Sequence, residues 1–283
     1  MAGNDFRLIV HNVGHGQSVH AFAPSGHSVV VDLGRSDEFS PLRWLRKSRS
    51  SIDLLVVTHP HGDHIDEITL LDPLSLRPRQ LIRPRWLTRQ EVVNANQSDY
   101  SDHVVTYLAL SDSSSYPIPE EQRVGNPAVT GGLTIATFFS SECGRSNINN
   151  HSGVVVFEYL GVKVVVPGDN ESPSWRALLE KPAFQSAIKG ADVFVASHHG
   201  RTSGYCPELF DVFKPRLCVV SDGRVQDTDA TIRYSGHARG WAVDSRSGTA
   251  AEQRYCLTTR TDGFVDIRVG QGTERPFLAV TSD

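Results

Sequence analysis

The stretch His59-Pro60-His61-Gly62-Asp63-His64 begins one residue after the apolar run Leu54 to Val57 and is the strongest indication of the fold of this chain. Three imidazoles and one carboxylate within six positions are a dense set of metal ligands, since histidine is the commonest side-chain ligand of zinc-like ions. A buried strand that ends in this set would hold the ligands rigidly at its carboxyl edge. The alternative is a polar loop after a core strand, a structure that does not need so many histidines.

The spacing inside this motif favours two metal ions. His59 and His61 are two positions apart, so their side chains leave an extended segment on the same side. Asp63 and His64 are adjacent and diverge, so they suit a neighbouring ion. Asp63 also precedes a predicted helix over 65–71, where a carboxylate suits the positive end of the helix dipole. The motif completes neither site, so we expect the rest of the chain to supply further ligands.

Residues of the same ligand types flank several other apolar strands. Each of them alone has an ordinary explanation as a turn residue. Metal sites in such folds are assembled from several loops at one edge, so the combination predicts a metal centre. The residues concerned are Asp32, His151, Asp169, His198 and His199.

The order of apolar segments predicts an α/β fold, with two packed mixed β-sheets and helices on their outer faces. We expect one domain over residues 1–283, because the chain shows no linker and no repeat. The predicted strands are 6–11, 18–23, 28–32, 53–58, 133–139, 153–159, 162–166 and 192–196. The predicted helices are 41–47, 65–71, 175–179 and 207–213.

The region from Arg83 to Gly132 is the least patterned part of the chain. Its polar tract, 111–117, is typical either of a lid or binding loop or of a disordered surface insert. Arginines stand close together at its start, with Trp86 among them. Either the arginines bind phosphates while Trp86 stacks on a base, or the arginines form a solvated surface. These arginines are Arg77, Arg79, Arg83, Arg85 and Arg89.

The chain resembles the metallo-β-lactamase superfamily from residue 6 to about residue 269. The motif 59–64 fits the superfamily's HxHxDH signature in full. His151, Asp169 and His199 stand where the third histidine, the bridging aspartate and the last histidine are expected. Asp32 stands where an early structural aspartate is expected. The resemblance implies the αββα sandwich of the superfamily.

Within the superfamily the chain looks most like the soluble metallo-hydrolase domain of the ComEC DNA-uptake proteins. The matching segments are 12–18, 31–34, 168–170, 197–200, 214–216, 236–237 and 260–263. Four positions depart from the family pattern, which usually has Asp, Gln, Asp and Ser there. They are Asn12, His15, Gln17 and Arg201. These departures leave the expected metal ligands unchanged, but they leave the identity of the substrate open.

The resemblance implies a hydrolase with two divalent metal ions, zinc or manganese, and a water activated between them. Asp63, His64 and His199 would hold one ion, and Asp169 would bridge to the other. The second ion would be held by His59, His61 and His151. Asp32 would orient the ligands by hydrogen bonding.

Further roles follow from the same resemblance. The catalytic candidates are Asp63, Asp169, His198 and His237. The sequence leaves open which of His198 and His199 binds metal; we favour His199 as the ligand and His198 as a substrate contact or proton donor. The candidate substrate contacts are His15, Arg201, Arg83, Arg85 and Trp86; His15, Arg201 and His237 have the alternative of ordinary surface residues.

Three functions remain open at this point. The first is a phosphodiesterase that cleaves DNA, preferably single-stranded. The second is a hydrolase of a small phosphodiester, such as a cyclic nucleotide or phosphocholine ester, or of a lactone; the third is a noncatalytic scaffold stabilised by metal. The formal net charge of −4 argues against a broad basic surface but does not exclude a nuclease.

The compartment and partners follow from composition. The chain has four cysteines without a CxxC pair, which suits the reducing cytoplasm. We expect a cytoplasmic protein without a membrane partner, because no segment reaches the roughly 18 apolar residues of a membrane span. The expected partner is nucleic acid or a small phosphodiester. The sequence does not indicate an oligomeric state.

Overall fold

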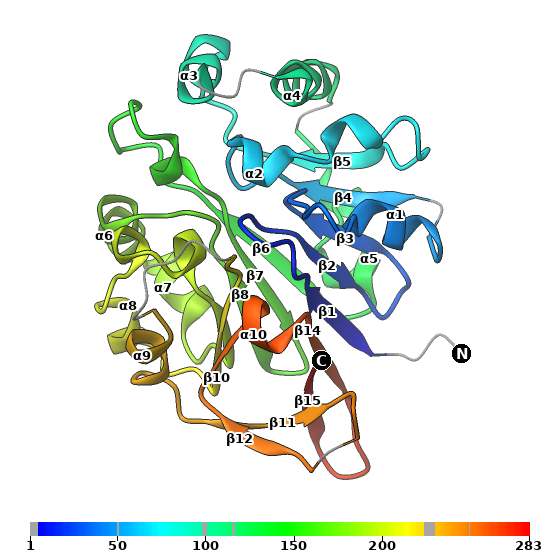
Figure 1. The fold of residues 1–283 in the computed structure, drawn as a ribbon, viewed down its shortest axis with the longest axis vertical. Coiled ribbons are helices and arrows are strands. Elements are labelled where there is room, and N and C mark those ends of the chain that lie inside the picture. The colour runs from blue at the N-terminus through cyan, green and yellow to red at the C-terminus, as the bar shows by residue number, and fades with distance from the viewer. Residues whose placement is uncertain (1–4, 50, 98–100, 115–116, 224–229, 249) are drawn as a thin grey trace.

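A computed structural model describes residues 5–49, 51–97, 101–114, 117–223, 230–248 and 250–283. Within these residues the chain forms two packed β-sheets with helices on both outer faces (Figure 1). Both sheets contain parallel and antiparallel strand pairs. The predicted αββα sandwich is therefore confirmed. No helix in the described parts is long and apolar enough to cross a membrane.

The first sheet has nine strands. Its middle is antiparallel, whereas β3, β4 and β5 run parallel to one another. In spatial order the strands are β12 (Glu252–Arg254), β11 (Trp241–Ser245), β15 (Pro276–Ser282), β14 (Val265–Gln271), β1 (Phe6–Val10), β2 (Val19–Phe22), β3 (Ser28–Val31), β4 (Ile52–Val56) and β5 (Pro78–Ile82).

The second sheet has six strands. Its first four are parallel, and the last two pair antiparallel as a hairpin. In spatial order they are β13 (Cys256–Thr258), β10 (Leu217–Val220), β9 (Val193–Val195), β8 (Val162–Val166), β7 (Val154–Tyr159) and β6 (Thr134–Phe138). The carboxyl ends of parallel strands meet at one edge of each sheet, which is where the candidate ligands follow.

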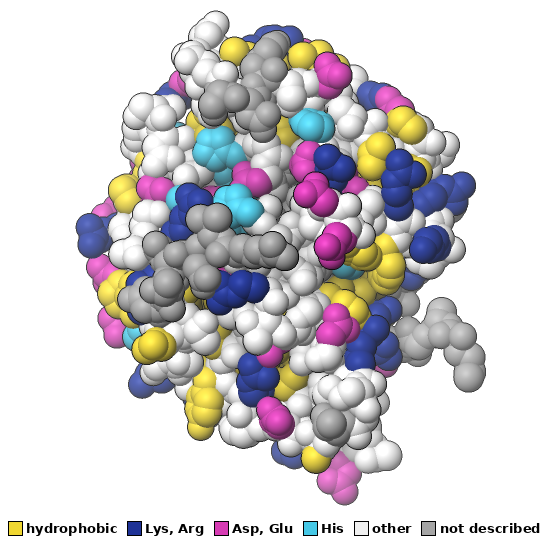
Figure 2. Space-filling view, viewed as in Figure 1, with side chains coloured by type: hydrophobic (Ala, Val, Ile, Leu, Met, Phe, Trp, Pro, Cys, Tyr) yellow, Lys and Arg dark blue, Asp and Glu magenta, His cyan; other side chains and the backbone are white. Residues whose placement is uncertain are grey.

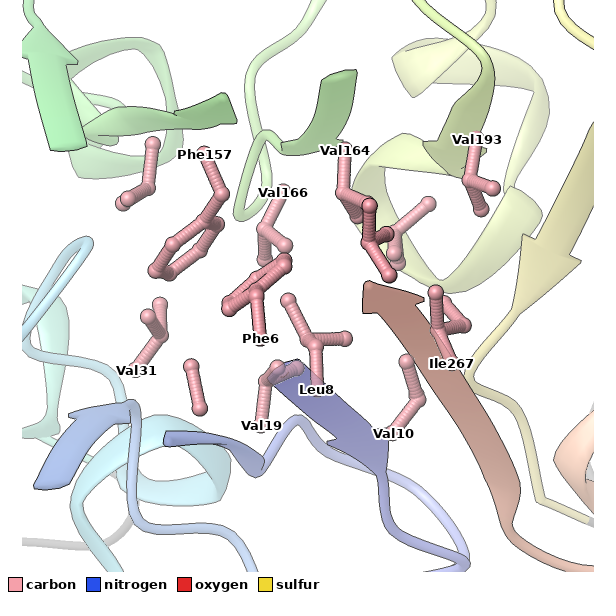
Figure 3. Close-up of a cluster of buried hydrophobic side chains, with 14 of the residues drawn as sticks. Phe6, Leu8, Val10, Val19, Val31, Phe157, Val164, Val166, Val193 and Ile267 are labelled. Carbon is pink, nitrogen blue, oxygen red and sulfur yellow. The ribbon is translucent and has the colours of Figure 1, made fainter. Parts of the chain in front are cut away.

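The space between the sheets is filled by alternate residues of the strands. Phe6, Leu8 and Val10 of β1 point inward, whereas Ile9 points to the outer helices. Figure 3 shows the inward side chains of both sheets meeting, and the rings of Phe6 and Phe157 stack with centroids 5.7 Å apart. Because both faces of the central strands are covered, these strands appear in the sequence as continuous apolar runs.

Helices cover the two outer faces. The first sheet carries α1 (Pro41–Arg46), α2 (Gly62–Ile65), η1 (Ile68–Leu70), α3 (Arg89–Ala95) and α4 (Asp102–Ser113), whose apolar residues share one buried cluster with the sheet. The second sheet carries α6 (Ser172–Leu179), α7 (Pro182–Ile188), α8 (Leu209–Val212) and α9 (Ala230–Ser235). The remaining short helices are η3 (Glu120–Gln122), α5 (Pro127–Thr130), η4 (Ile148–His151), η5 (Ser197–Gly200), η6 (Thr202–Gly204) and α10 (Thr259–Asp262).

Two predictions of local structure were wrong. The predicted helix over 65–71 is divided into α2 and η1, because the Glu67 N–H donates to Leu33 O of a neighbouring loop and not to a helical carbonyl. The region from Arg83 to Gly132 is not a disordered insert where it is described. Val104 and Tyr107 of α4 are buried in the outer cluster of the first sheet. Residues 98–100 and 115–116 of this region lie outside the described residues, and a lid role stays a prediction.

Two histidines, His11 and His20, are buried on the outer face of the first sheet. The rings of His11 and His20 lie 4.4 Å apart, and Trp44 of α1 packs against both. Neither nitrogen of His20 has a hydrogen-bond partner. Burial, with Arg7 nearby, lowers the pKa of His11 to about 3, and burial with His11 lowers the pKa of His20 well below its usual value. Both imidazoles are therefore neutral in the folded protein.

Because His20 is buried in its neutral form, the free energy of unfolding should decrease at acidic pH. Its pKa is lower in the folded than in the unfolded chain, so its stabilisation is complete above pH 6.5 and declines as the pH falls below that value. Between pH 6.5 and 5 this costs about 2 kcal/mol for one histidine. We expect His20→Leu to reduce the difference in the free energy of unfolding between pH 7 and pH 5, measured by urea titration. His27→Gln, at a partly exposed turn position, is the control. An unchanged difference in His20→Leu would contradict this account.

Candidate metal centre

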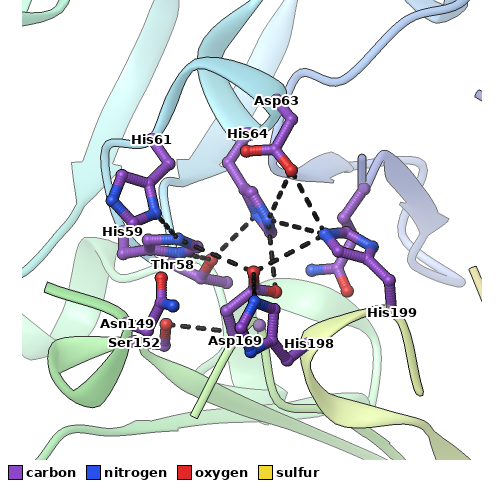
Figure 4. Close-up of polar contacts among 12 residues, drawn as sticks. Thr58, His59, His61, Asp63, His64, Asn149, Ser152, Asp169, His198 and His199 are labelled. Carbon is purple, nitrogen blue, oxygen red and sulfur yellow. Dashed lines mark hydrogen bonds and ion pairs between the residues drawn. The ribbon is translucent and has the colours of Figure 1, made fainter. Parts of the chain in front are cut away.

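The two sheets bring their ligand-bearing strand ends together at one edge of the sandwich. Asp32 follows β3 and the motif 59–64 follows β4 in the first sheet. Asp169 follows β8 and the pair 198–199 follows β9 in the second sheet. Figure 4 shows the side chains of these segments pointing toward one another across the gap between the sheets. Residues more than 100 positions apart therefore form one cluster.

One group of four side chains is compact enough to hold an ion. His64 Nε2 lies 3.2 Å from Asp169 Oδ1 and 3.4 Å from His199 Nε2. His199 Nε2 lies 3.3 Å from Asp63 Oδ2 and 3.5 Å from Asp169 Oδ2. One ligand atom from each of the four residues lies within 4.8 Å of the others. These are the residues expected around one ion.

The first two histidines of the motif form a second group beside the first. His59 Nε2 lies 2.9 Å from His61 Nδ1 and 3.9 Å from Asp169 Oδ2. The Asp169 carboxylate is almost fully buried and faces both groups. Its position between them is the position that a bridging ligand requires.

The carboxylates of the cluster favour positive charge beside them. Burial by itself lowers the pKa of His64, but the carboxylates of Asp169, Asp32 and Asp63 raise it well above its usual value. At His199 burial is likewise outweighed by the same two neighbours, Asp169 and Asp63, and the pKa rises to about 9. Burial raises the pKa of Asp169, but His64 and His199 bring it well below its usual value. The Asp169 carboxylate thus stays ionised and stabilises positive charge beside it.

A divalent cation fits this donor set. His59 Nε2 lies 2.9 Å from His61 Nδ1, and His64 Nε2 lies 3.4 Å from His199 Nε2. Only one proton can lie between the two nitrogens of each pair, so each pair leaves at least one lone pair for a cation. Mixed imidazole and carboxylate ligands suit zinc, and manganese accepts them as well. The sites for two ions, as implied by the resemblance, are therefore chemically consistent with the residues present.

Asp32 accepts hydrogen bonds from residues in and next to the motif 59–64 and fixes their orientation. Its Oδ2 accepts hydrogen bonds from His64 Nδ1 at 2.7 Å, from the Thr58 hydroxyl at 2.7 Å and from Gln17 Nε2 at 2.9 Å, and its Oδ1 accepts from the Thr58 N–H at 2.7 Å. Its backbone has a φ of 60°, which L-residues rarely adopt and which these bonds stabilise. Because Nδ1–H of His64 donates to Asp32, Nε2 is left with its lone pair toward the cluster.

The histidine pair lies in an unusual turn. His198 and His199 have φ values of 51° and 53°, and Gly200 follows with 78°. Two successive left-handed residues send both rings to the cluster side. His199 Nδ1–H donates to Ser221 O at 2.9 Å, which directs Nε2 to the group of four.

Two predicted site residues lie outside the cluster. His151 is buried, but its Nδ1 contacts Trp86 Nε1 at 3.0 Å and Ser140 O at 3.1 Å. His237 stacks on Phe210 with centroids 4.0 Å apart, and its Nε2 hydrogen-bonds the Tyr205 hydroxyl at 2.6 Å. Within the described residues no contact joins either histidine to the cluster. His237 therefore lies away from the cluster, and its catalytic role stays a prediction. His151 as a ligand also stays a prediction, because its Nε2 is buried without a hydrogen-bond partner among the described residues.

The predicted substrate contacts divide into two sets. His15 and Arg201 lie at the mouth of the centre: His15 Nε2 is 3.3 Å from Asp63 Oδ2, and an Arg201 nitrogen is 3.5 Å from His15 Nε2. Figure 2 shows histidine and acidic side chains together on this face of the surface. Arg83, Arg85 and Trp86 instead line a cleft between β5 and β6, so their contact with a substrate at the centre stays a prediction.

The arginine-rich stretch is mostly engaged within the protein. Arg77 pairs with Asp72, Arg79 with Asp53 and Arg89 with Asp112. Arg83 donates to Ser111 O. This arrangement favours the alternative of an internally paired, solvated face.

Several contributing residues were not anticipated from the sequence. Glu171 contacts His198, and Asn147 and Asn149 donate to its carboxylate. Figure 4 draws Asn149 beside His59. Glu171 lies only two positions after Asp169, and this proximity was the one available signal in the sequence.

The Asp32 contacts generate a first prediction for the centre. Asp32→Asn places an N–H group where His64 and Thr58 both donate, so we expect zinc affinity to fall by about 10–100-fold. The affinity can be measured by competition with a zinc chelator. Asp53→Asn is a matched control, because Asp53 is a buried carboxylate that accepts a backbone N–H at the other end of β4. Equal losses in the two variants would show a general effect on folding.

Comparisons with known proteins found similarity to one family model and to several proteins. A family model described as the metallo-beta-lactamase superfamily matches residues 13–68. Ribonuclease Z of Aeropyrum pernix is 41% identical over 71 residues, which are 22% of this chain and 23% of that protein. ComE operon protein 3 of Bacillus subtilis is 22% identical over 232 residues, which are 75% of this chain and 28% of that protein.

The crystal structure of the metallo-beta-lactamase fold protein YhfI from Bacillus subtilis aligns with a TM-score of 0.48 at 12% identity, over 89% of this chain and 95% of that one. The chain spans about a quarter of the length of the two curated relatives above. The family match contains the whole motif 59–64 together with His15 and Asp32. Over residues 13–68 the chain is therefore similar to the metallo-beta-lactamase superfamily.

Proposed function

We propose that this protein is a metal-dependent phosphodiesterase that cleaves nucleic acid, with single-stranded DNA as the preferred substrate. The observation that carries the proposal is the compact group formed by Asp63, His64, Asp169 and His199 at the joint edge of two sheets. The Asp63 side chain is 26% exposed and that of His15 is 43% exposed, so the centre is open to substrate on this side.

The roles of the residues follow from their positions. When bound, divalent cations supply Lewis-acid polarisation of a substrate oxygen and acidify a coordinated water. Asp169 would hold the two halves of the centre together, and Asp32 fixes the orientation of His64. Arg201 would bind a phosphate oxygen, because its guanidinium lies beside both His15 and His198 at the mouth.

Two comparisons support a phosphodiester substrate. The segment that carries the motif is 41% identical to part of a protein named ribonuclease Z. A longer match, at 22% identity, is to ComE operon protein 3. The resemblance to ComEC-type metallo-hydrolase domains favours DNA over RNA. Since most arginines of the stretch 77–89 are paired internally, binding would depend on few cations near the centre.

A second candidate function has one specific observation in its favour. A cleft of about 710 Å³ adjoins the centre through His15 and is lined by the carboxylates of Asp37, Glu38, Asp222 and Asp283. Its size suits a small molecule, and its acidic lining disfavours a polyanion. A hydrolase of a small phosphodiester or of a lactone is therefore the alternative.

Cleavage of end-labelled single-stranded DNA with added manganese or zinc tests the proposal. We expect the Asp63→Ala, Asp169→Ala double variant to lose at least about 100-fold in rate, because the metal contribution is several kcal/mol. Asp112→Ala removes an exposed carboxylate far from the motif in sequence and serves as the control. If the wild type with bound metal cleaves bis(p-nitrophenyl) phosphate or a lactone but no nucleic acid, the alternative function replaces the proposal.

Arg201 provides a separate test of substrate contact. We expect Arg201→Ala to raise the KM for DNA about tenfold with little change in kcat, because one hydrogen bond to a charged group is lost. Arg89→Ala is the matched control, since Arg89 is an exposed arginine paired with Asp112. An unchanged KM in Arg201→Ala would remove this residue from the substrate site.

A further inference from the structure

We infer that the cleft between β5 and β6 is a second binding site, which takes nucleotides of a single strand whose scissile bond lies at the metal centre. Arginines of the cleft would bind the phosphates, and its aromatic side chains would stack on the bases. The inference rests on the proposed action on nucleic acid and names where the uncut part of that substrate binds.

The cleft lies on the open side of the sandwich, where β5 and β6 are the edge strands of the two sheets. A short segment closes it at one end. The Val124 N–H donates to Gln80 Oε1 of β5 at 2.9 Å. One residue further, Gly125 O accepts from the Ile135 N–H of β6 at 3.0 Å. The cleft has a volume of about 660 Å³, which is within the range of small-molecule sites.

The other end of the cleft adjoins the metal centre. The Val57 N–H donates to Ile82 O at 2.9 Å, so the end of β5 lies beside the end of β4, where the motif of metal ligands begins. The Phe139 ring packs on Gly153, since a Cβ at this glycine would come within 2.7 Å of the ring. The Gly153 N–H in turn donates to Thr58 O at 2.9 Å. Both walls of the cleft therefore end beside the segment that carries the first ligands.

The charged side chains that line the cleft, within the described residues, are all arginines: Arg83, Arg85 and Arg123. Arg123 is paired with Glu120 at the surface, whereas the other two follow β5 directly, at the end beside the centre. The cleft on the His15 side of the centre has the opposite charge, because carboxylates line it. A polyanion that reaches the centre should therefore extend into the cleft between β5 and β6.

Two polar atoms of the cleft are buried without a hydrogen-bond partner in the described part of the chain, Arg83 Nε and Thr137 Oγ1. Arg83 uses a different nitrogen, Nη2, to donate to Ser111 O at 3.3 Å. It thereby differs from three other arginines of the stretch 77–89, which are paired with carboxylates. A buried donor without a partner is unfavourable, so a phosphate oxygen that accepts from Arg83 would remove a cost that the free protein carries.

The apolar wall of the cleft suits a base. Trp86, Phe138 and Phe139 line it at the end beside the centre. The rings of Trp86 and Phe139 meet edge to face with centroids 5.4 Å apart, and both side chains are partly exposed. The Trp86 N–H donates to His151 Nδ1 at 3.0 Å, which fixes the indole. Aromatic rings beside arginines are the combination with which proteins bind single strands without reading their sequence.

Binding of a single strand without cleavage tests the inference. The probe is a fluorescein-labelled oligothymidylate of about ten nucleotides, with EDTA present so that it is not cut. We expect Arg83→Gln to raise its Kd about tenfold, measured by fluorescence anisotropy, because a hydrogen bond to a charged group is lost. The slope of log Kd against log salt concentration should also fall by about 0.7, which corresponds to one phosphate contact with a single strand. Arg83→Lys keeps the charge and should keep the slope.

Matched variants separate the cleft from the rest of the surface. Arg89→Gln removes the same charge from an exposed arginine that is paired with Asp112 and is not part of the described lining of the cleft. We expect it to leave Kd unchanged. Phe139→Leu should raise Kd about fivefold through lost stacking. Phe277→Leu, at an exposed phenylalanine of β15, should not.

The outcomes separate the inference from the proposed function. Equal effects of Arg83→Gln and Arg89→Gln, or an unchanged Kd in Arg83→Gln and Phe139→Leu, would overturn the inference while DNA cleavage by the wild type stands. If the wild type binds the probe through the cleft but cleaves no nucleic acid with any metal, the binding site stands and the proposed function is wrong. A wild type that neither binds nor cleaves the oligonucleotide would overturn both.

Discussion

The contact of the buried Asp169 carboxylate with the surrounding histidines is the interaction on which the rest of the centre depends. The carboxylate lies between His64 and His199 on one side and His59 on the other, and His64 and His199 stabilise its charge. A carboxylate buried without such partners would cost several kcal/mol. The protein therefore has to fix the positions of the two sheets relative to each other, so that Asp169 of the second sheet contacts the histidines of the first.

The sandwich provides that register through its core. Alternate residues of β1, β3 and β4 fill the space between the sheets, so a one-residue slip of any strand would place polar side chains in the core. Asp32 directly follows β3, and His59, Asp169 and His198 each stand three residues after the end of β4, β8 or β9, so short connections to packed strands fix their positions. Contacts behind the two histidines of the group of four complete the arrangement: Asp32 orients His64, and Ser221 O orients His199.

Much of the fold and part of the site could be predicted from the sequence. Continuous apolar runs marked the buried strands, and the dense motif 59–64 marked the centre. The helices α3 and α4 were missed because α4 has polar residues spread around it and is held by tertiary packing of Val104 and Tyr107. The strands β14 and β15 were also missed, although β14 alternates apolar residues with polar or small ones, as a half-buried strand does.

The sequence by itself determined which chemical groups are available: the motif after β4, the aspartates after β3 and β8, and the histidine pair after β9. These could be recognised because each ligand closely follows an apolar strand in the chain. Only the tertiary structure decided which of the twelve histidines meet. It brought His198 to Asp169 and left His151 on Trp86 and His237 on Phe210. The physical reason is that ring direction depends on backbone φ and on the hydrogen bond to the second ring nitrogen, and both are set by residues distant in the sequence.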